Sequence, residues 1–326
     1  MRIALIYLGR RGGGARLLRD LSHSWNIPEN SVTCFVRTGC EFLDDLGSEF
    51  IAFSLPKSNW RLLLPWNKFR FSRKISQKID GGQFHFAVFV MSHPWTPLLL
   101  KKFKRSRVKT VAFIHDNRPH KGEKWPTRYH VKREVRLADF PVFFSRFVSR
   151  SFPKISHPLV FSLDALPLIP QSKKIQRILI PGRIRKYKGL RKISKHLSSA
   201  PETYQIMFAG QGRFKISRFD ADRFKLINEW LPSEDFERLI MESTHILLPY
   251  IEATQSGIIS IAKLYNCHIL ITNVGGLLEQ LQGYEVWSII PTDPKDFSDA
   301  LYGRQRIHDT QIPSLPSIFN LFSYLS

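Results

Sequence analysis

Short apolar runs, each followed by a polar or glycine-containing stretch, recur along the whole chain. Continuous apolar runs such as residues 84–91 and 108–114 are typical of strands buried on both faces of a parallel sheet. Amphipathic segments separate several of these runs, and they predict helices that begin near Ala15 and cover residues 233–243 and 258–265. The predicted strands cover residues 2–8, 32–37, 49–53, 84–91, 108–114, 140–145, 157–161, 177–180, 205–209, 224–228, 245–248, 268–272 and 286–291.

This succession of strands and helices predicts two α/β domains in tandem, built from βαβ units. Residues 164–174 contain Pro167 and Pro170 and predict the linker between the two domains. We expect the N-terminal domain over residues 1–165 and the C-terminal domain over residues 172–309. Each is expected to be a Rossmann-like, doubly wound sheet with its site at the carboxyl ends of the strands.

Composition supports a globular protein and adds a strong charge. Of the 326 residues 43% are hydrophobic, enough to form cores, and the formal net charge is +22. Residues 1–170 hold 29 Lys and Arg against 12 Asp and Glu, a net charge of +17, whereas residues 171–326 have a net charge of +5. The first half is therefore expected to meet an anionic partner, which can be membrane lipid, nucleic acid or a phosphorylated substrate.

Other features of the sequence predict a cytoplasmic protein. There is no apolar run of eighteen residues that would predict a transmembrane helix, and the first residues are typical of a strand, not of a signal peptide. The three cysteines, Cys34, Cys40 and Cys267, lack the spacing of metal ligands, which favours a reducing compartment over a disulfide scaffold.

Aromatic and basic residues alternate in one stretch of the first half, residues 59–74. It holds two Trp, two Phe, three Leu and five basic residues but no acid, a composition that suits a membrane interface. A helix that packs on the N-terminal domain with a solvated basic face is the alternative. A second basic cluster, residues 101–107, favours membrane contact, and no nucleic-acid recognition motif is present. The expected membrane residues are Trp60, Trp66, Phe69, Arg70, Lys101 and Lys102.

Two glycine-containing loops follow predicted strands. The first contains Gly12, Gly13 and Gly14 and does not have the spacing of a dinucleotide fingerprint, so it indicates either an anion or sugar cradle or a flexible turn. The second contains Arg183 and Lys188, whose spacing can place both cations on a diphosphate.

Two further polar loops stand at carboxyl ends of predicted strands. Residues 249–262 run from Pro249 through Ser256-Gly257 into a helix whose first N–H groups suit a phosphate, although an ordinary turn fits the same residues. His115 and Asp116 follow another strand, and either can take or position the proton of an acceptor hydroxyl. A histidine after a strand is more often structural, and a metal site with His120 lacks further ligands at suitable spacing.

Several motifs of the chain stand in a characteristic order: Gly182-Arg183-Ile184 with Tyr187-Lys188-Gly189, Ala209-Gly210-Gln211-Gly212, Pro249-Tyr250 with Ser256-Gly257, and Gly275-Gly276-Leu277-Leu278-Glu279. In this order they resemble the GT-B glycosyltransferases of the large family 4 group, which builds bacterial polysaccharides. The first half adds His115-Asp116 with Pro119-His120, similar to the "HN…PH" segment of one branch, and His157-Pro158, similar to its "HP" turn.

The resemblance implies two Rossmann-like domains with a cleft between them. Arg183 and Lys188 would neutralise the nucleotide diphosphate as the glycosidic bond breaks. His115 would face the donor sugar and acceptor, together with Asp116, and a C-terminal helix over about 310–326 would cross back to the N-terminal domain. The implied donor-binding residues are Gly182, Arg183, Lys188, Tyr250, Thr254, Ser256, Gly257, Ile258 and Glu279. Those implied for the acceptor side of the cleft are Gly12, Gly13, Gly14 and His120.

One departure from this family concerns a pair of glutamates eight residues apart, which handle the sugar and the ribose in most members. When the sequences are aligned on Gly257, Thr254 and Ala262 occupy the two positions, and Glu252 lies two residues too early. A branch with an "ATQSG" segment resembles this chain and also lacks the pair.

These features together predict a cytoplasmic glycosyltransferase on the inner face of the membrane. It would transfer a sugar from a nucleotide diphosphate sugar, with a UDP-sugar expected, to a lipid-linked oligosaccharide or polysaccharide such as a capsule or exopolysaccharide. No cofactor or metal is expected. The alternatives are a nucleotide-sugar epimerase of the same fold and a basic lipid- or nucleic-acid-binding protein on a degenerate transferase scaffold.

Overall fold

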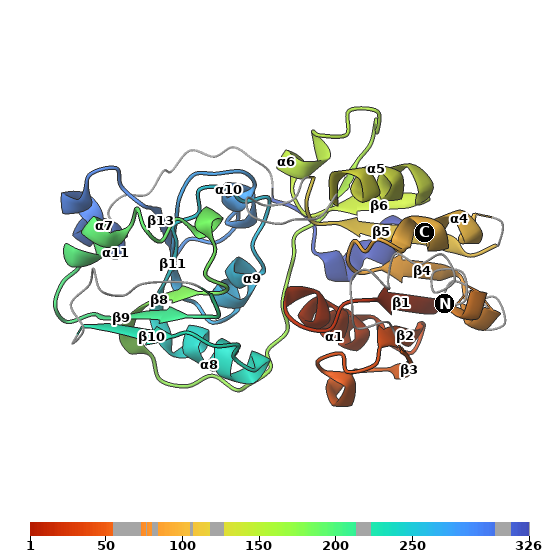
Figure 1. Cartoon of the computed structure of the whole chain (residues 1–326), viewed down its shortest axis with the longest axis horizontal. Helices are drawn as coiled ribbons and strands as arrows, with labels where there is room; N and C mark the ends of the chain where they lie inside the picture. Colours follow the sequence, from red (N-terminus) through yellow and green to blue (C-terminus); the bar gives the residue numbers. More distant parts are fainter. Residues whose placement is uncertain are drawn as a thin grey trace. The chain divides into compact units, whose positions relative to one another are not determined.

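A computed structural model of the chain describes residues 1–54, 73–75, 77–79, 84–104, 107–117, 127–212, 223–303 and 314–325. Two compact units form, each around its own parallel sheet (Figure 1). Among the described residues, those of 1–117, 127–161 and 317–325 belong to unit 1, and those of 162–316 belong to unit 2.

Unit 1 contains a seven-stranded sheet in the order β3-β2-β1-β4-β5-β6-β7, and every pair of neighbours is parallel. The strands are β1 (Arg2–Tyr7), β2 (Ser31–Arg37), β3 (Glu49–Phe53), β4 (Phe86–Phe89), β5 (Lys109–Ile114), β6 (Phe140–Phe143) and β7 (Leu159–Val160). The helices are α1 (Gly13–Trp25), α4 (Thr96–Phe103), α5 (Thr127–Leu137) and α6 (Arg146–Ser149), with 3₁₀ helices η1 (Leu43–Asp45) and η4 (Ile318–Tyr324).

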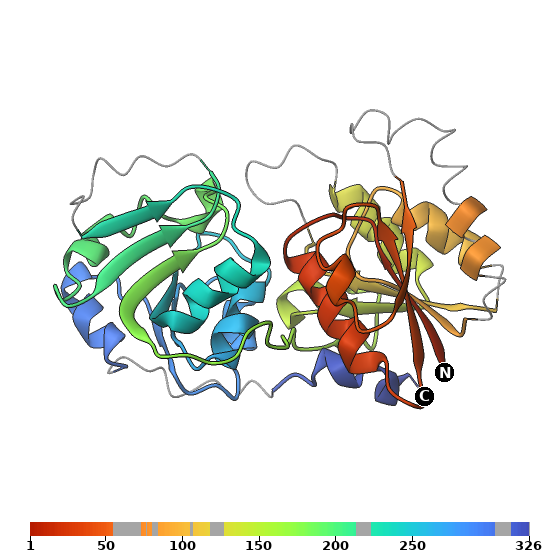
Figure 2. The same cartoon turned by 90° about the horizontal axis from the view of Figure 1, so that it is seen from below.

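Helices cover both faces of this sheet. Ala4, Ile6 and Phe89 point to one face and share a core with apolar residues of α4, α5 and α6. Helix α1 lies on the other side, as Figures 1 and 2 show. Because successive strand residues point to opposite faces, strands covered on both sides are apolar throughout, and this is why they appear as continuous apolar runs.

Unit 2 contains a six-stranded parallel sheet in the order β10-β9-β8-β11-β12-β13. The strands are β8 (Ile175–Pro181), β9 (Gln205–Ala209), β10 (Phe224–Ile227), β11 (Ser243–Leu248), β12 (His268–Ile271) and β13 (Trp287–Ile289). The helices are α7 (Ser194–Ser198), α8 (Ser233–Glu242), α9 (Gly257–Leu264), α10 (Leu277–Gln280) and α11 (Phe297–Leu301), with η2 (Lys186–Lys188) and η3 (Pro294–Asp296). Its two cores pack α7 and α11 on one face and α8, α9 and α10 on the other.

The predicted α/β class with two Rossmann-like sheets is confirmed. All predicted strands are present, and their ends differ from the predicted ends by at most two residues, because the ladder hydrogen bonds set the ends. Among the described residues no helix is both long and apolar enough to cross a membrane.

The C-terminal segment differs from the expected amphipathic helix. It forms the short 3₁₀ helix η4, which begins only after Pro316, whose ring disfavours a helical residue before it. Ser317 caps it by accepting a hydrogen bond from the Phe319 N–H. In unit 1, the Trp25 indole donates to the carbonyl of Phe319, and Ile318 is fully buried.

Candidate functional site

The strand order of the two sheets predicts one ligand crevice in each unit. In both, the first strand of the unit lies between its second and fourth strands: β1 lies between β2 and β4, and β8 lies between β9 and β11. This is the doubly wound order in which successive crossovers leave toward opposite sides, and ligands bind where the order reverses, outside the carboxyl ends of the two strands. The crevices are therefore expected at β1/β4 in unit 1 and at β8/β11 in unit 2.

In unit 2 the residues after β8 meet the start of α9. Gly182 has a φ of +99°, and a Cβ added to it would lie 3.2 Å from Cδ1 of Ile258 and 3.6 Å from Nζ of Lys188. The loop after β8 and the start of α9 therefore approach each other at Gly182, where a side chain would fill the space between them. This is the place where the motif glycine, the lysine and the first turn of α9 can face one ligand.

Lys188 is the cation of this crevice with the most altered environment. Its Nζ lies 3.7 Å from the centroid of the Tyr250 ring and hydrogen-bonds the Tyr250 hydroxyl. Burial, and then the charge of Arg183, lower the pKa of Lys188 to about 7. An anion in the crevice would stabilise the charged ammonium, so the chemistry of these residues suits a negatively charged ligand.

The loop before α9 is held in place by a side-chain amide. Gln280 accepts a hydrogen bond from the Ser256 N–H at 2.7 Å and donates from Nε2 to the Ser256 carbonyl at 3.3 Å. The Ser256 hydroxyl lies 3.3 Å from the hydroxyl of Tyr250. The N–H of Ser256 is therefore already used, whereas Gly257 and Ile258 begin the helix, where N–H groups have no intrahelical acceptor.

The remaining donor-side residues line the same loops. Thr254 and Glu279 are both buried, with 5% and 9% of their surface exposed. Gly275 has a φ of +59°, and a Cβ there would lie 1.6 Å from the carbonyl oxygen of Ala253, so the loop after β12 packs directly on the loop after β11. The nine expected donor residues thus come from the loops and the first helical turns at the carboxyl ends of the unit 2 strands. Their binding roles remain predictions.

In unit 1 the three glycines of the first loop precede or begin α1. Gly12 has a φ of +83°, and its N–H donates to Oε2 of Glu41 at 3.0 Å. A Cβ at Gly14 would lie 2.7 Å from the Tyr7 ring, whereas one at Gly13 would meet open space. The loop is therefore closely packed at Gly14 and accessible at Gly13, beside the start of a thirteen-residue helix.

His115 occupies a different environment from the one expected for a group facing substrates. Only 5% of its surface is exposed, its Nε2 donates to the carbonyl of Val90 at 2.9 Å, and its ring stacks on Phe144. Burial lowers its pKa. These contacts tie β5 to the end of β4 and suit a structural histidine, so its catalytic role, with that of the half-buried Asp116, remains a prediction. His120 lies outside the described residues.

A polar cluster that sequence reasoning did not select lies at the β1/β4 crevice. The Ser92 hydroxyl and the His93 N–H, both just after β4, donate to the carboxyl group of Glu134 on α5. Burial raises the pKa of Glu134 to about 7, and burial followed by the charges of Arg37 and His130 lowers that of His93 to about 3. Knowledge of the strand order would have pointed to Ser92 and His93.

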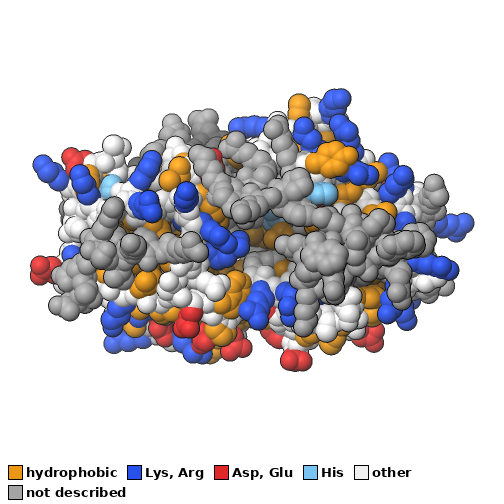
Figure 3. Space-filling view, viewed as in Figure 1, with side chains coloured by type: hydrophobic (Ala, Val, Ile, Leu, Met, Phe, Trp, Pro, Cys, Tyr) orange, Lys and Arg blue, Asp and Glu red, His pale blue; other side chains and the backbone are white. Residues whose placement is uncertain are grey.

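Of the expected membrane residues, only Lys101 and Lys102 lie in the described part of the chain, on α4. Lys101 is exposed and Lys102 half-buried, while Leu99 and Leu100 of the same helix are buried in the core. Trp60, Trp66, Phe69 and Arg70 lie outside the described residues. Figure 3 shows Lys and Arg side chains gathered over α4 and α5.

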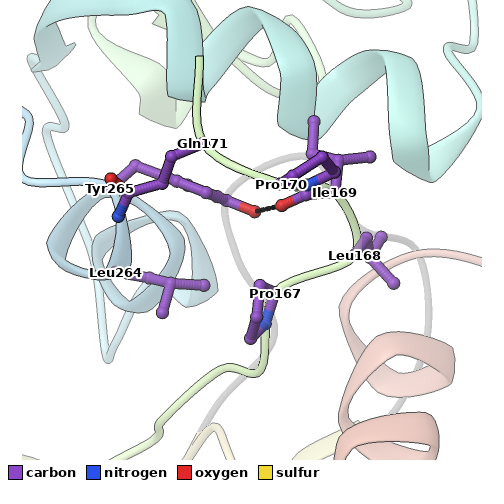
Figure 4. Close-up of a pocket in the computed structure, with 7 residues that line it drawn as sticks. All are labelled: Pro167, Leu168, Ile169, Pro170, Gln171, Leu264 and Tyr265. Atoms are coloured by element: carbon purple, nitrogen blue, oxygen red, sulfur yellow. Dashed lines mark hydrogen bonds between the residues drawn. The ribbon is translucent and has the colours of Figure 1, made fainter.

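A cavity of about 390 Å³ lies elsewhere in unit 2, between the linker residues and the end of α9. Figure 4 shows Tyr265 pointing toward the linker, where its hydroxyl donates to the carbonyl of Ile169 at 3.1 Å. The lining residues are Pro167, Leu168, Ile169, Pro170, Gln171, Leu264 and Tyr265. None of them is charged, and they lie at the opposite end of α9 from Gly257, so this cavity is not suited to a phosphate.

No protein-family model matches the sequence, and no curated protein matches it. Solved structures do match over nearly the whole chain. HepE of Anabaena, in complex with UDP and glucose, superposes with a TM-score of 0.69 at 13% identity over 95% of this chain and 91% of its own. The lipopolysaccharide outer core galactosyltransferase WaaB superposes with a TM-score of 0.60 at 13% identity, over 94% of this chain and 92% of its own. The chain has the GT-B fold.

Another GT-B neighbour comes from Listeria monocytogenes and is assigned as a UDP-N-acetylglucosamine 2-epimerase. It superposes with a TM-score of 0.68 at 12% identity, over 99% of this chain and 94% of its own. At these identities the likeness shows the fold alone. The reaction has to be argued from the residues of the site.

Proposed function

We propose that this GT-B protein is a glycosyltransferase that takes a sugar from a nucleotide diphosphate sugar, with a UDP-sugar as the expected donor. The arrangement around Lys188 carries the proposal: a largely desolvated ammonium group, Gly182 and the first turn of α9 converge outside the carboxyl ends of β8 and β11. Cations and helix N–H groups at such a crevice suit the phosphates of a nucleotide.

The same residues explain how the donor bond could break. As the glycosidic bond lengthens, negative charge grows on the leaving diphosphate. Lys188 and Arg183 would stabilise that charge more strongly in the transition state than in the ground state, which lowers the barrier. Removal of water from Lys188 strengthens this interaction, because charges attract more strongly in a poorly solvated site.

Nucleotide binding tests this proposal directly. Calorimetric titration with UDP should show binding that falls at least tenfold in Arg183→Ala plus Lys188→Ala, while the charge-matched surface pair Lys132→Ala plus Arg133→Ala on α5 should bind UDP like the parent. Transfer of sugar from a panel of UDP-, GDP- and dTDP-sugars would then identify the donor. If the first pair has no effect on nucleotide binding and no sugar is transferred, the proposal is wrong.

An epimerase is the second candidate, because the Listeria neighbour has the same fold over 99% of this chain. Both activities would use the diphosphate-binding residues, but only a transferase needs an acceptor. Incubation of UDP-sugars with the protein alone, followed by chromatography of the products, separates the two. A new UDP-sugar formed without acceptor would favour the epimerase. A degenerate scaffold would bind lipid but neither react with nor bind a nucleotide sugar.

For the acceptor we propose a lipid-linked oligosaccharide at an anionic membrane surface. Helix α5 supports this, since Lys132, Arg133 and Arg136 are exposed and Tyr129 is 63% exposed beside them, while the acid of this helix, Glu134, is buried. An exposed aromatic ring among cations suits the head-group region.

Sedimentation with liposomes tests the membrane contact. Vesicles with 30% anionic lipid should retain the protein, and the retained fraction should fall with added salt and in the double variant Lys132→Gln plus Arg133→Gln. Neutral vesicles are the control. Equal retention by neutral and anionic vesicles would contradict an electrostatic contact.

A further inference from the structure

The carboxyl ends of β1, β2 and β4 in unit 1 bring cationic and hydrogen-bond-donating groups together. β2 ends at Arg37, the loop after β1 contains Arg10, and the loop after β4 contains His93. The strand order β2-β1-β4 makes these three ends neighbours, and the order reverses at β1. This crevice is therefore the ligand position of the unit 1 sheet by the same rule that selects Lys188 in unit 2.

The two arginines lie near each other. Nη2 of Arg10 is 2.9 Å from the position of a Cβ at Gly39, two residues beyond Arg37, and the Arg10 main chain is fixed there because its carbonyl accepts from the Glu41 N–H at 2.7 Å. Burial, and then the charge of Arg10, lower the pKa of Arg37. The like charges of the two guanidinium groups therefore repel each other, and an anion bound beside both would be stabilised by both.

His93 contributes a neutral donor in a fixed orientation. Its Nδ1 accepts a hydrogen bond from the Trp95 N–H at 3.2 Å, so in the neutral ring the proton is on Nε2. Its main-chain N–H is bound by Glu134 at 3.3 Å, and the second oxygen of that carboxyl group is bound by Ser92. Because burial and the charges of Arg37 and His130 lower its pKa to about 3, the ring remains a neutral donor near pH 7.

Among the described residues, two acidic groups near this crevice already accept hydrogen bonds. Glu41 accepts from the Gly12 N–H at 3.0 Å and partly offsets the charge of the arginines. Glu134 faces Ser92 and the main chain of His93, and burial raises its pKa to about 7, so it is only partly ionised at neutral pH. Farther along the loop after β2, Asp45 is paired with Arg19 and His23 of α1. Among the described residues nearest the strand ends, Arg10, Arg11 and Arg37 therefore outnumber Glu41. The chemistry that fits two guanidinium groups and an imidazole N–H is a phosphate group.

We propose that Arg37, Arg10 and the Nε2–H of His93 form a phosphate subsite in unit 1 that binds the phosphate of the acceptor. The inference rests on the proposed function, because it specifies the group by which the acceptor is held. Glu134 and Ser92 are positioning residues, since they fix the loop that carries His93. The subsite would distinguish a phosphate-linked lipid from a neutral glycolipid.

The phosphate could come from a lipid-linked acceptor or from a free phosphate compound, and binding measurements separate these sources. The full-length protein is first saturated with UDP, which fills the proposed donor loops of unit 2. It is then titrated by calorimetry with octyl diphosphate, with inorganic pyrophosphate and with octyl glucoside. A lipid-phosphate subsite should bind octyl diphosphate at least tenfold more tightly than octyl glucoside. Tighter binding of pyrophosphate than of octyl diphosphate would instead assign the subsite to free phosphate compounds and overturn the acceptor assignment.

Variants then connect this binding to the named residues. Arg37→Gln should weaken octyl diphosphate binding at least tenfold, and Arg37→Lys should recover part of the loss. His93→Phe should weaken it about fivefold, and His93→Gln, which keeps a donor, should weaken it less. Lys109→Gln removes the same charge at the amino end of β5, where Lys109 is exposed and lies at the opposite end of the strands from the crevice. This variant should bind octyl diphosphate like the parent.

Thermal unfolding of each variant shows whether it folds, and Arg10→Gln at an exposed residue replaces Arg37→Gln if that variant does not. The proposed subsite is wrong if Arg37→Gln binds octyl diphosphate as tightly as Lys109→Gln does. The same holds for Arg10→Gln where it replaces Arg37→Gln. The donor titration separates this failure from failure of the proposed function. If the parent protein does not bind UDP but Arg37→Gln loses octyl diphosphate binding, the proposed subsite stands and the proposed glycosyltransferase function is wrong. If UDP binding depends on Lys188 but octyl diphosphate binding does not change in Arg37→Gln, the proposed glycosyltransferase function stands and the proposed subsite is wrong.

Discussion

At the scale of single residues, Lys188 links ligand binding to protonation. Its pKa of about 7 lies well below the ordinary value of 10.5, because burial and Arg183 disfavour the ammonium. Between pH 7 and 10.5 the unfolded chain therefore binds more protons at this residue than the folded one does. Stability rises with pH wherever the unfolded state binds more protons. The stability that comes from keeping Lys188 neutral is therefore present at high pH and is lost as the pH falls toward 7.

Replacement of Lys188 by Met should remove this dependence. Between pH 7 and 9, the increase in free energy of unfolding with pH should be smaller in Lys188→Met than in the parent, by up to about 1.4 kcal/mol for each pH unit. Urea unfolding at several pH values measures it, and Lys186→Met, an exposed lysine two residues away, is the control. Parallel stability curves for parent and Lys188→Met would show that Lys188 titrates normally.

A second residue-scale prediction concerns Gly189, which ends η2 with a φ of +70°. A Cβ there would lie 1.7 Å from the carbonyl oxygen of Pro249. Gly283 has the same φ, but a Cβ there would meet nothing within 4 Å. Gly283→Ala should therefore lower the free energy of unfolding by about 1–2 kcal/mol, which is the cost of a left-handed alanine. Gly189→Ala should lower it by at least about 2 kcal/mol more and should weaken UDP binding. Equal destabilisation in chemical unfolding would show that the loop after β8 can move away from Pro249.

At the scale of elements, Gln280 holds the loop before α9 through hydrogen bonds in both directions with Ser256. Gln280→Met keeps the volume of the side chain but leaves the Ser256 N–H unpaired, while the Ser256 carbonyl keeps only its hydrogen bond from the Ile259 N–H. This loss should cost about 1–3 kcal/mol of stability. UDP affinity should fall severalfold, since the first turn of α9 is no longer fixed. Gln176→Met, which removes a hydrogen bond to Thr203 near the amino end of β8, should destabilise less and leave UDP binding unchanged.

Elements were also the scale at which the sequence was most informative. Apolar runs identified the strands of the described residues, including the partly exposed β3 and β10. The segment after Ser256 was recognised as a helix because its pattern is local. The neighbours of each strand were not predictable, because a buried apolar run does not encode which strand it pairs with. This explains why His115 was selected and His93 was not: His115 follows β5, whereas the order β2-β1-β4-β5 places the crevice at β1 and β4.

The pairing of Glu134 with Ser92 was beyond sequence reasoning for the same physical reason. The two residues are 42 positions apart, and on α5 the glutamate stands among exposed basic residues, where the pattern predicts a solvated face. Only the packing of α5 on the end of β4 shows that this carboxyl group points inward. The resemblance to GT-B enzymes selected loops that the structure brings together in unit 2, since those motifs are contiguous and follow the strands that position them. Their donor-binding roles stay predictions.

At the scale of the whole molecule, the chain enters unit 2 at Ser162 and returns to unit 1 for its last described residues. In unit 1, Ile318 and Leu321 are fully buried, and the ring of Phe322 lies 4.8 Å from that of Trp25 and 5.1 Å from that of Phe86. Residues near the C-terminus therefore complete a core that begins with β1 and α1. Burial of two aliphatic side chains and one aromatic ring is worth several kcal/mol.

Truncation after Pro316 should consequently destabilise unit 1 and leave unit 2 folded. We expect two unfolding transitions by calorimetry in the truncated chain, the lower one shifted down by at least about 10 °C, and added UDP should raise only the transition of unit 2. Tyr324→Ala removes a ring that is 57% exposed and is the control, with a shift of at most a few degrees expected. If truncation shifts no transition, or if UDP stabilises the transition that truncation lowers, the assignment of the C-terminal segment to the unit 1 core is wrong.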